Sequence, residues 1–67
     1  MNGKYIAVTW SVEASRELGI YQRMMDFDRD LMHTLRMCIN AEARRQGVAV
    51  IDVAFAKKAI SEWECGE

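Results

Sequence analysis

The sequence predicts a mainly α-helical protein with a short N-terminal strand or extended arm, one long helix and a shorter C-terminal helix. The two helices are expected to form a helical hairpin, and two copies of the chain a dimer. Three observations support this class: the chain contains no proline, apolar residues recur at helical spacing from position 13 to 46, and a second helical pattern follows. The 67 residues are expected to form a single small domain, 1–67, near the lower size limit for a self-sufficient core.

Residues 4–11 alternate between two sets of side chains, with β-branched and aromatic residues among them. This period of two predicts a strand with one apolar face. A lone strand cannot satisfy its backbone, so it must pair. Three partners remain open: the same strand of a second copy, the run 48–52, or the edge of another protein. Ser11 is a suitable N-cap for the following helix, and Glu13 suits its first turn.

The long helix is placed at 12–46, and its apolar residues form two adjacent stripes. One stripe is Ile20, Met24, Phe27, Leu31, Leu35 and Cys38, and the other is Tyr21, Met25, Met32, Ile39 and Ala43. Together they cover nearly half of the helix surface, more than an ordinary surface helix buries. We therefore expect a second copy of the chain to cover part of this face, and Cys38 to be a small core residue.

Two glycines mark this helix. Gly19 either caps a short first helix or lies within a continuous helix, with or without a kink. The spacing of Ala14, Leu18 and Tyr21 keeps its phase across Gly19, which favours continuity. Gly47 follows two arginines and is a conventional helix stop.

The second helix is placed at 50–64, with Asp52 as an acceptable cap. Its apolar face comprises Phe55, Ala56, Ala59, Ile60 and Trp63. Whether residues 48–52 are strand or helix stays open.

Composition limits the function. The net charge is −1, the hydrophobic share 51% and the charged share 28%, as in a globular protein without bulk attraction to nucleic acid or anionic lipid. Two cysteines form no disulfide framework. No signal-peptide pattern and no membrane-spanning stretch is found. We expect a cytoplasmic protein with neither nucleic acid nor membrane as partner.

No catalytic or metal-binding motif is found. Asp26, Asp28 and Asp30 resemble the start of an EF-hand loop, but Leu31 and Met37 stand where that loop needs Gly and Glu. His33 is the single histidine and has no recognisable nucleophile beside it. We therefore expect no enzymatic activity, no cofactor and no metal.

The candidate sites lie on the long helix. Tyr21, Met24, Met25 and Asp28 are the expected partner-binding residues, because apolar anchors surround one central charge. Asp28 is alternatively a dimer or interhelix ion pair. The expected dimer and core residues are Ile20, Phe27, Leu31, Met32, Leu35, Ile39, Phe55 and Trp63.

These features favour a homodimeric protein–protein interaction module that inhibits a target protein. The alternative is a ribbon–helix–helix DNA-binding regulator, which has the same order of elements. Such regulators carry Arg, Lys, Gln or Asn at the strand positions that read bases, and this chain does not. In general character the chain resembles the small accessory proteins with which bacteriophages disable host factors. That resemblance implies a host target in the host cytoplasm, such as a transcription activator, a defence effector or a motility ATPase.

Overall fold

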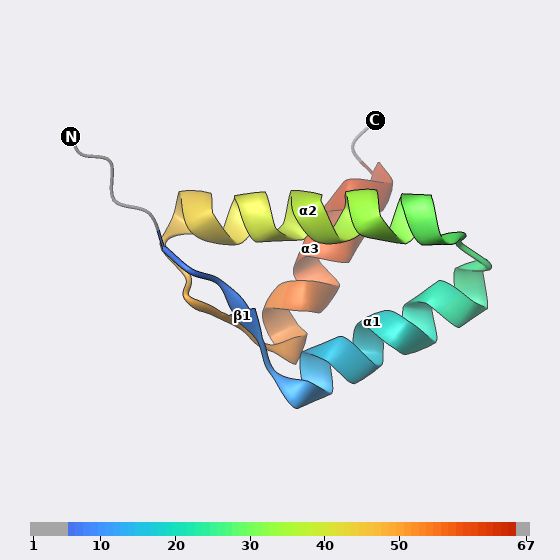
Figure 1. Ribbon diagram of the computed structural model, residues 1–67, viewed down its shortest axis with the longest axis horizontal. Coiled ribbons are helices and arrows are strands. Elements are labelled where there is room, and N and C mark those ends of the chain that lie inside the picture. Colours follow the sequence, from blue (N-terminus) through green and yellow to red (C-terminus); the bar gives the residue numbers. More distant parts are fainter. Residues whose placement is uncertain (1–5, 66–67) are drawn as a thin grey trace.

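The computed structural model describes residues 6–65 and shows three helices and two short strands (Figure 1). Their order is β1 (Thr9–Trp10), α1 (Val12–Met25), α2 (Arg29–Gln46), β2 (Val50–Ile51) and α3 (Val53–Cys65). The mainly helical class is confirmed. The single helix 12–46 is wrong, and with it the two-helix hairpin. Positions 4 and 5 of the predicted strand lie outside the described residues.

The predicted long helix ends and restarts between Met25 and Arg29. Asp26 has the left-handed φ of 56°, its N–H donates to the Arg23 carbonyl over 3.3 Å, and the Phe27 N–H donates to the Gln22 carbonyl over 3.2 Å. This pair of bonds is a Schellman motif. Asp28 then caps α2, since its carboxylate accepts the Leu31 N–H over 2.8 Å. The chain thus reverses direction over three residues.

The other helix ends follow the sequence closely. Ser11 caps α1 by accepting the Ala14 N–H over 3.0 Å, and α1 continues through Gly19 as the apolar phase indicated. Gly47, with φ 76°, ends α2. Asp52 accepts the Phe55 N–H over 2.8 Å, so α3 begins at Val53 rather than at residue 50.

Residues Val50–Ile51 form a strand, which settles the assignment left open for this segment. β1 and β2 are parallel, with Thr9 opposite Val50 and Trp10 opposite Ile51. The Thr9 N–H donates to the Ala49 carbonyl and the Ser11 N–H to the Ile51 carbonyl, each over 2.9 Å. Of the three pairing partners left open, the structure shows the run within the same chain.

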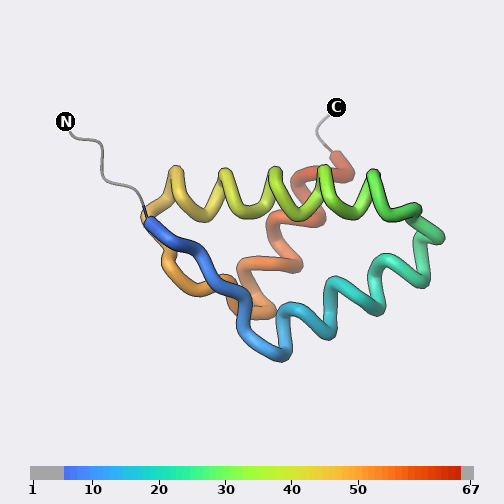
Figure 2. Tube along the Cα trace, viewed as in Figure 1, coloured from blue at the N-terminus to red at the C-terminus, as the bar shows by residue number. Residues whose placement is uncertain are grey.

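α1 and α2 diverge from their shared corner, and α3 starts near the N-terminal end of α1 and crosses α2 (Figures 1 and 2). α3 is the helix that each of them contacts most. The Lys57 ammonium lies 3.8 Å from the Glu17 carboxylate, which links α3 to α1 at the surface. This arrangement leaves α1 and α2 with facing sides that do not pack closely on each other.

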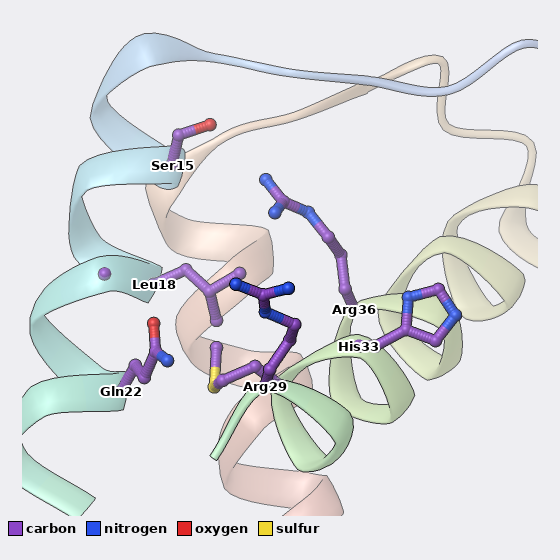
Figure 3. A pocket seen from close by; sticks show the side chains of 8 residues that line it. Ser15, Leu18, Gln22, Arg29, His33 and Arg36 are labelled. Carbon is purple, nitrogen blue, oxygen red and sulfur yellow. The ribbon is translucent and has the colours of Figure 1, made fainter. Parts of the chain in front are cut away.

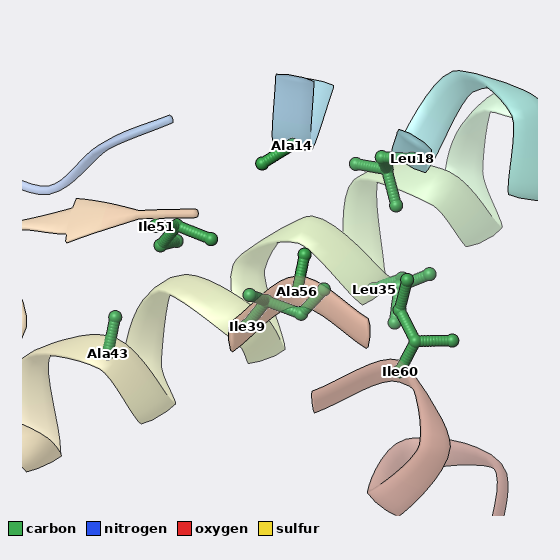
Figure 4. Packing of buried hydrophobic residues seen from close by; sticks show 8 residues of the cluster. All are labelled: Ala14, Leu18, Leu35, Ile39, Ala43, Ile51, Ala56 and Ile60. Carbon is green, nitrogen blue, oxygen red and sulfur yellow. The ribbon is translucent and has the colours of Figure 1, made fainter. Parts of the chain in front are cut away.

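The core lies where α1, α2, β2 and α3 meet (Figure 4). It consists of Ala14, Leu18, Leu35, Ile39, Ala43, Ile51, Ala56 and Ile60. Small side chains make up three of these positions, so α3 approaches its neighbours closely. The broad apolar face of the predicted helix is therefore divided between two helices, each of which turns a narrower stripe toward α3.

The expected core and dimer residues separate into three groups. Leu35 and Ile39 are buried, as predicted, within one chain. Phe27, Met32, Phe55 and Trp63 are partly buried and pack against the core. Ile20 and Leu31 are exposed, and so is Cys38, contrary to its predicted core position.

Candidate functional site

Exposed apolar side chains gather where α1 ends and α2 begins. Met24 is 77% exposed, Met25 46%, Leu31 38% and Ile20 37%. Met24 and Met25 lie in the last turn of α1, Leu31 lies in the first turn of α2, which begins after three connecting residues, and Ile20 lies one turn before Met24. We call Ile20, Met24, Met25 and Leu31 the corner surface. An exposed cluster of large apolar side chains commonly marks a binding surface in a small protein.

Tyr21 faces inward from this corner rather than outward. Its hydroxyl donates a hydrogen bond to the Glu64 carboxylate of α3. Its ring meets Phe27 edge-on at 5.5 Å, and Phe27 in turn meets Trp63 at 5.8 Å. Burial, followed by the hydrogen bond to Glu64 and its negative charge, raises the pKa of Tyr21 to about 12. Tyr21 thus links the C-terminal part of α1 to the C-terminal part of α3 through these contacts.

Asp28 is an exposed N-cap and does not project from the middle of an apolar helix face. The interpretation of Asp28 as a charge within such a face is wrong, because the helix that would present it ends at Met25. Of the four predicted partner residues, Met24 and Met25 lie on the open surface. Tyr21 and Asp28 shape the corner that carries them.

A groove of about 410 Å³ lies between α1 and α2 (Figure 3). Its α1 side is formed by Ser15, Leu18, Gly19 and Gln22, and its α2 side by Arg29, Met32, His33 and Arg36. Figure 3 shows both arginine side chains extending from α2 into the space between the helices. Among the residues that the structure describes, the lining contains two guanidinium groups and no carboxylate. We call this feature the arginine groove.

Trp10 of β1 contacts α2 at Arg36, one of the residues that line the groove. The indole N–H donates to the Asn40 side-chain oxygen over 2.8 Å. The Arg36 guanidinium carbon lies 5.1 Å from the centre of the Trp10 ring, within the range of a cation–π interaction. Trp10 is thereby fixed on α2, and Arg36 is held beside it.

Sequence reasoning missed the arginine groove, although one signal was present. Arg29, His33 and Arg36 are spaced by four and three residues, which places them on one side of a helix. That spacing could not reveal what faces them. The opposing wall comes from α1, and it exists only because the chain turns back at Asp26.

Among residues 6–65, no three His, Cys, Asp or Glu side chains come together in a metal-binding group. The same residues include no helix long and apolar enough to cross a membrane. Comparison with protein-family models, with curated proteins and with solved structures gave no match.

Proposed function

We propose that this chain is a non-enzymatic protein–protein interaction module that inhibits a host regulatory protein by covering part of its surface. The observation that carries the proposal is the corner surface. Met24 exposes 77% of its surface, and fully burying a methionine contributes roughly 1.5–3 kcal/mol. Methionine also adapts its shape to a partner, because it is unbranched and polarizable.

The structure of the corner supports binding without a large rearrangement. Two caps and the Tyr21–Glu64 hydrogen bond fix the backbone on both sides of the corner surface. A surface fixed in advance loses less conformational entropy when it binds. The inhibitory role and the host target come from the resemblance to bacteriophage accessory proteins, and candidate targets are a transcription activator, a defence effector or a motility ATPase.

The proposal includes a homodimer. Three of the eight buried core residues are alanines, and a core of this size in so short a chain rarely supplies more than about 3–5 kcal/mol. The dimer adds buried area that the chain alone lacks. Light scattering at micromolar concentration should give about twice the chain mass of 7.7 kDa. A monomer that unfolds cooperatively would contradict this part of the proposal.

The ribbon–helix–helix alternative has weaker support. That architecture needs antiparallel pairing of N-terminal strands from two copies. Here Thr9–Trp10 pairs in parallel with Val50–Ile51 of its own chain.

The test of the proposed function is affinity capture from a bacterial lysate with matched variants. Met24→Lys places a charge in the corner surface. Met37→Lys makes the same change at a methionine of α2 that is 57% exposed but lies two turns beyond the corner. We expect Met24→Lys to lose the captured protein and Met37→Lys to retain it. Equal capture by the two variants would refute the assignment of the corner surface.

A further inference from the structure

We propose that the arginine groove between α1 and α2 binds an acidic peptide segment of a partner protein, with carboxylates on Arg29 and Arg36 and an apolar side chain between them. This site is separate from the corner surface, and it stands on its own observations. They are the charge of the groove, its apolar floor and two residues that weaken the fold locally.

The first observation is unbalanced positive charge. Neither Arg29 nor Arg36 forms an ion pair with a carboxylate of residues 6–65. Arg36 contacts the Trp10 ring instead, which leaves the hydrogen-bonding edge of its guanidinium free for a ligand. A guanidinium presents its N–H donors in a planar fork that matches a carboxylate. Two such groups in one groove, neither paired with a carboxylate of residues 6–65, favour an anionic ligand.

The second observation is the floor. Leu18 is buried and Met32 is partly buried, and both line the groove. A site for a bare anion needs no apolar floor, whereas an amphipathic peptide does. The ligand therefore combines carboxylates with an apolar side chain.

The third observation is that two lining residues act against local stability. Gly19 lies inside α1, where glycine is unfavourable, yet a Cβ built on it meets no atom within 4 Å. The fold therefore does not require glycine at this position. Arg29 is the first residue of α2, where a cation opposes the helix dipole. Residues that are unfavourable for local structure, without a gain elsewhere in the fold, are expected at functional sites. Gly19 and Arg29 are two such residues, and both line the same groove.

The spacing of the arginines fits a peptide. Arg36 lies seven positions after Arg29, which is a rise of about 10 Å along the helix. In an extended peptide, alternate side chains lie on the same side and are about 7 Å apart, and the long, flexible arginine side chains can cover the difference. Carboxylates two positions apart can thus meet both guanidinium groups, while the side chain between them points the opposite way, toward Gly19 of α1.

A long polyanion such as nucleic acid fits less well. Asp26, Asp28 and Asp30 lie at the α1–α2 corner, directly beside Arg29 in the chain. A phosphate backbone that continued past Arg29 would meet these carboxylates. The whole chain also carries a net charge of −1, which provides no general attraction to phosphates.

The test is selection from a displayed library of random peptides on the full-length protein, followed by binding measurements on labelled synthetic copies. We expect enrichment of two acidic residues two positions apart with an apolar residue between them. The double variant Arg29→Gln, Arg36→Gln should bind the selected peptide at least tenfold more weakly. Gly19→Leu, which fills the groove, should do the same. Arg16→Gln removes an exposed cation of α1 outside the groove and should bind within about twofold of the unaltered protein.

Circular dichroism of each variant separates lost binding from lost folding, and Gly19→Leu fills the groove without removing a charge. Selected peptides without acidic enrichment would overturn the proposal. An equal loss in Arg16→Gln would also overturn it, because the attraction would then be general. Displacement of the peptide by millimolar inorganic phosphate, or by a short DNA duplex at the peptide's own concentration, would reassign the groove to phosphate groups.

Discussion

The two glycines among the described residues, Gly19 and Gly47, should respond in opposite ways to the same substitution. Gly19 lies inside α1 and Gly47 ends α2. An added Cβ meets no atom within 4 Å at either position, so steric contact does not distinguish them. The difference is in the backbone: among described glycines, positive φ is found at Gly47, with 76°.

The magnitudes follow from this difference. In a helix interior, alanine is more favourable than glycine by about 1 kcal/mol, so Gly19→Ala should raise the free energy of unfolding by up to that amount. For a residue with a Cβ, the left-handed backbone conformation is less favourable than the right-handed one by roughly 1–2 kcal/mol. Gly47→Ala should therefore lower the free energy of unfolding by about 1 kcal/mol. For a domain of this size, each kcal/mol corresponds to a change in Tm of about 4–8 °C.

The assay is urea unfolding followed by far-UV circular dichroism, at one protein concentration for all variants, because a dimer's stability depends on concentration. The midpoint should move up for Gly19→Ala and down for Gly47→Ala, with the slope unchanged. A destabilised Gly19→Ala protein would refute the continuous helix through residue 19. Shifts of the same sign would refute the argument as a whole.

Three further predictions concern the caps at the corner, the Tyr21 hydrogen bond and the proposed dimer. At the corner, Asp26→Gly should stabilise the protein by up to about 1 kcal/mol, because glycine adopts the left-handed φ of 56° without strain. Asp28→Ala should destabilise the protein by about 1 kcal/mol, because it removes the N-cap of α2. Urea unfolding measures both changes, and a loss of stability in Asp26→Gly would contradict the corner geometry. In a Tyr5→Phe protein, which leaves Tyr21 as its sole tyrosine, absorbance titration should give a pKa of about 12. Because this pKa is raised on folding, the stabilisation is fully present below about pH 10 and is lost as the pH rises toward 12; a midpoint near 10 would show that Tyr21 is not bonded to Glu64. For the proposed homodimer, dilution should lower the mass measured by light scattering to that of one chain and at the same time remove the helical far-UV spectrum; single chains that keep this spectrum would show that the core of one chain suffices.

The helix ends show how much of the fold was predictable. Ser11, Gly47 and Asp52 were each predicted as caps or stops and occupy those positions. Their side chains act on backbone groups only a few residues away, so the local sequence contains the whole signal. The pairing of β1 with the segment that forms β2 was one of three open alternatives, and its parallel direction was not predicted, because strand pairing depends on residues far apart in the chain.

The corner at Asp26 was not predicted. Gly47 and Asp26 end their helices with the same pair of backbone hydrogen bonds, but aspartate is much rarer than glycine in the left-handed conformation. The apolar spacing also keeps its phase across the corner, so periodicity alone favoured one helix. The predicted helix was also too long for the folded chain. A helix over 12–46 would be about 52 Å long, whereas the longest extent of the protein is 41 Å.

The same corner explains what could be predicted of the candidate sites. Met24 and Met25 were singled out because they are apolar residues of a broad face, and they lie exposed at the end of α1. The role of Tyr21 depends on Glu64, which is 43 positions away. The arginine groove needs α1 to lie opposite α2. Neither arrangement follows from helical spacing within one segment.

The most direct measurement of the central claim is the affinity of the captured target for three purified proteins: the unaltered chain, Met24→Lys and Met37→Lys. Loss of a buried methionine contact should cost at least about 1.4 kcal/mol, a tenfold change in Kd. Titration calorimetry should therefore show binding at least tenfold weaker for Met24→Lys, with both variants folded and Met37→Lys within twofold of the unaltered chain. Equal affinities for all three proteins would contradict the claim that the corner surface binds the target.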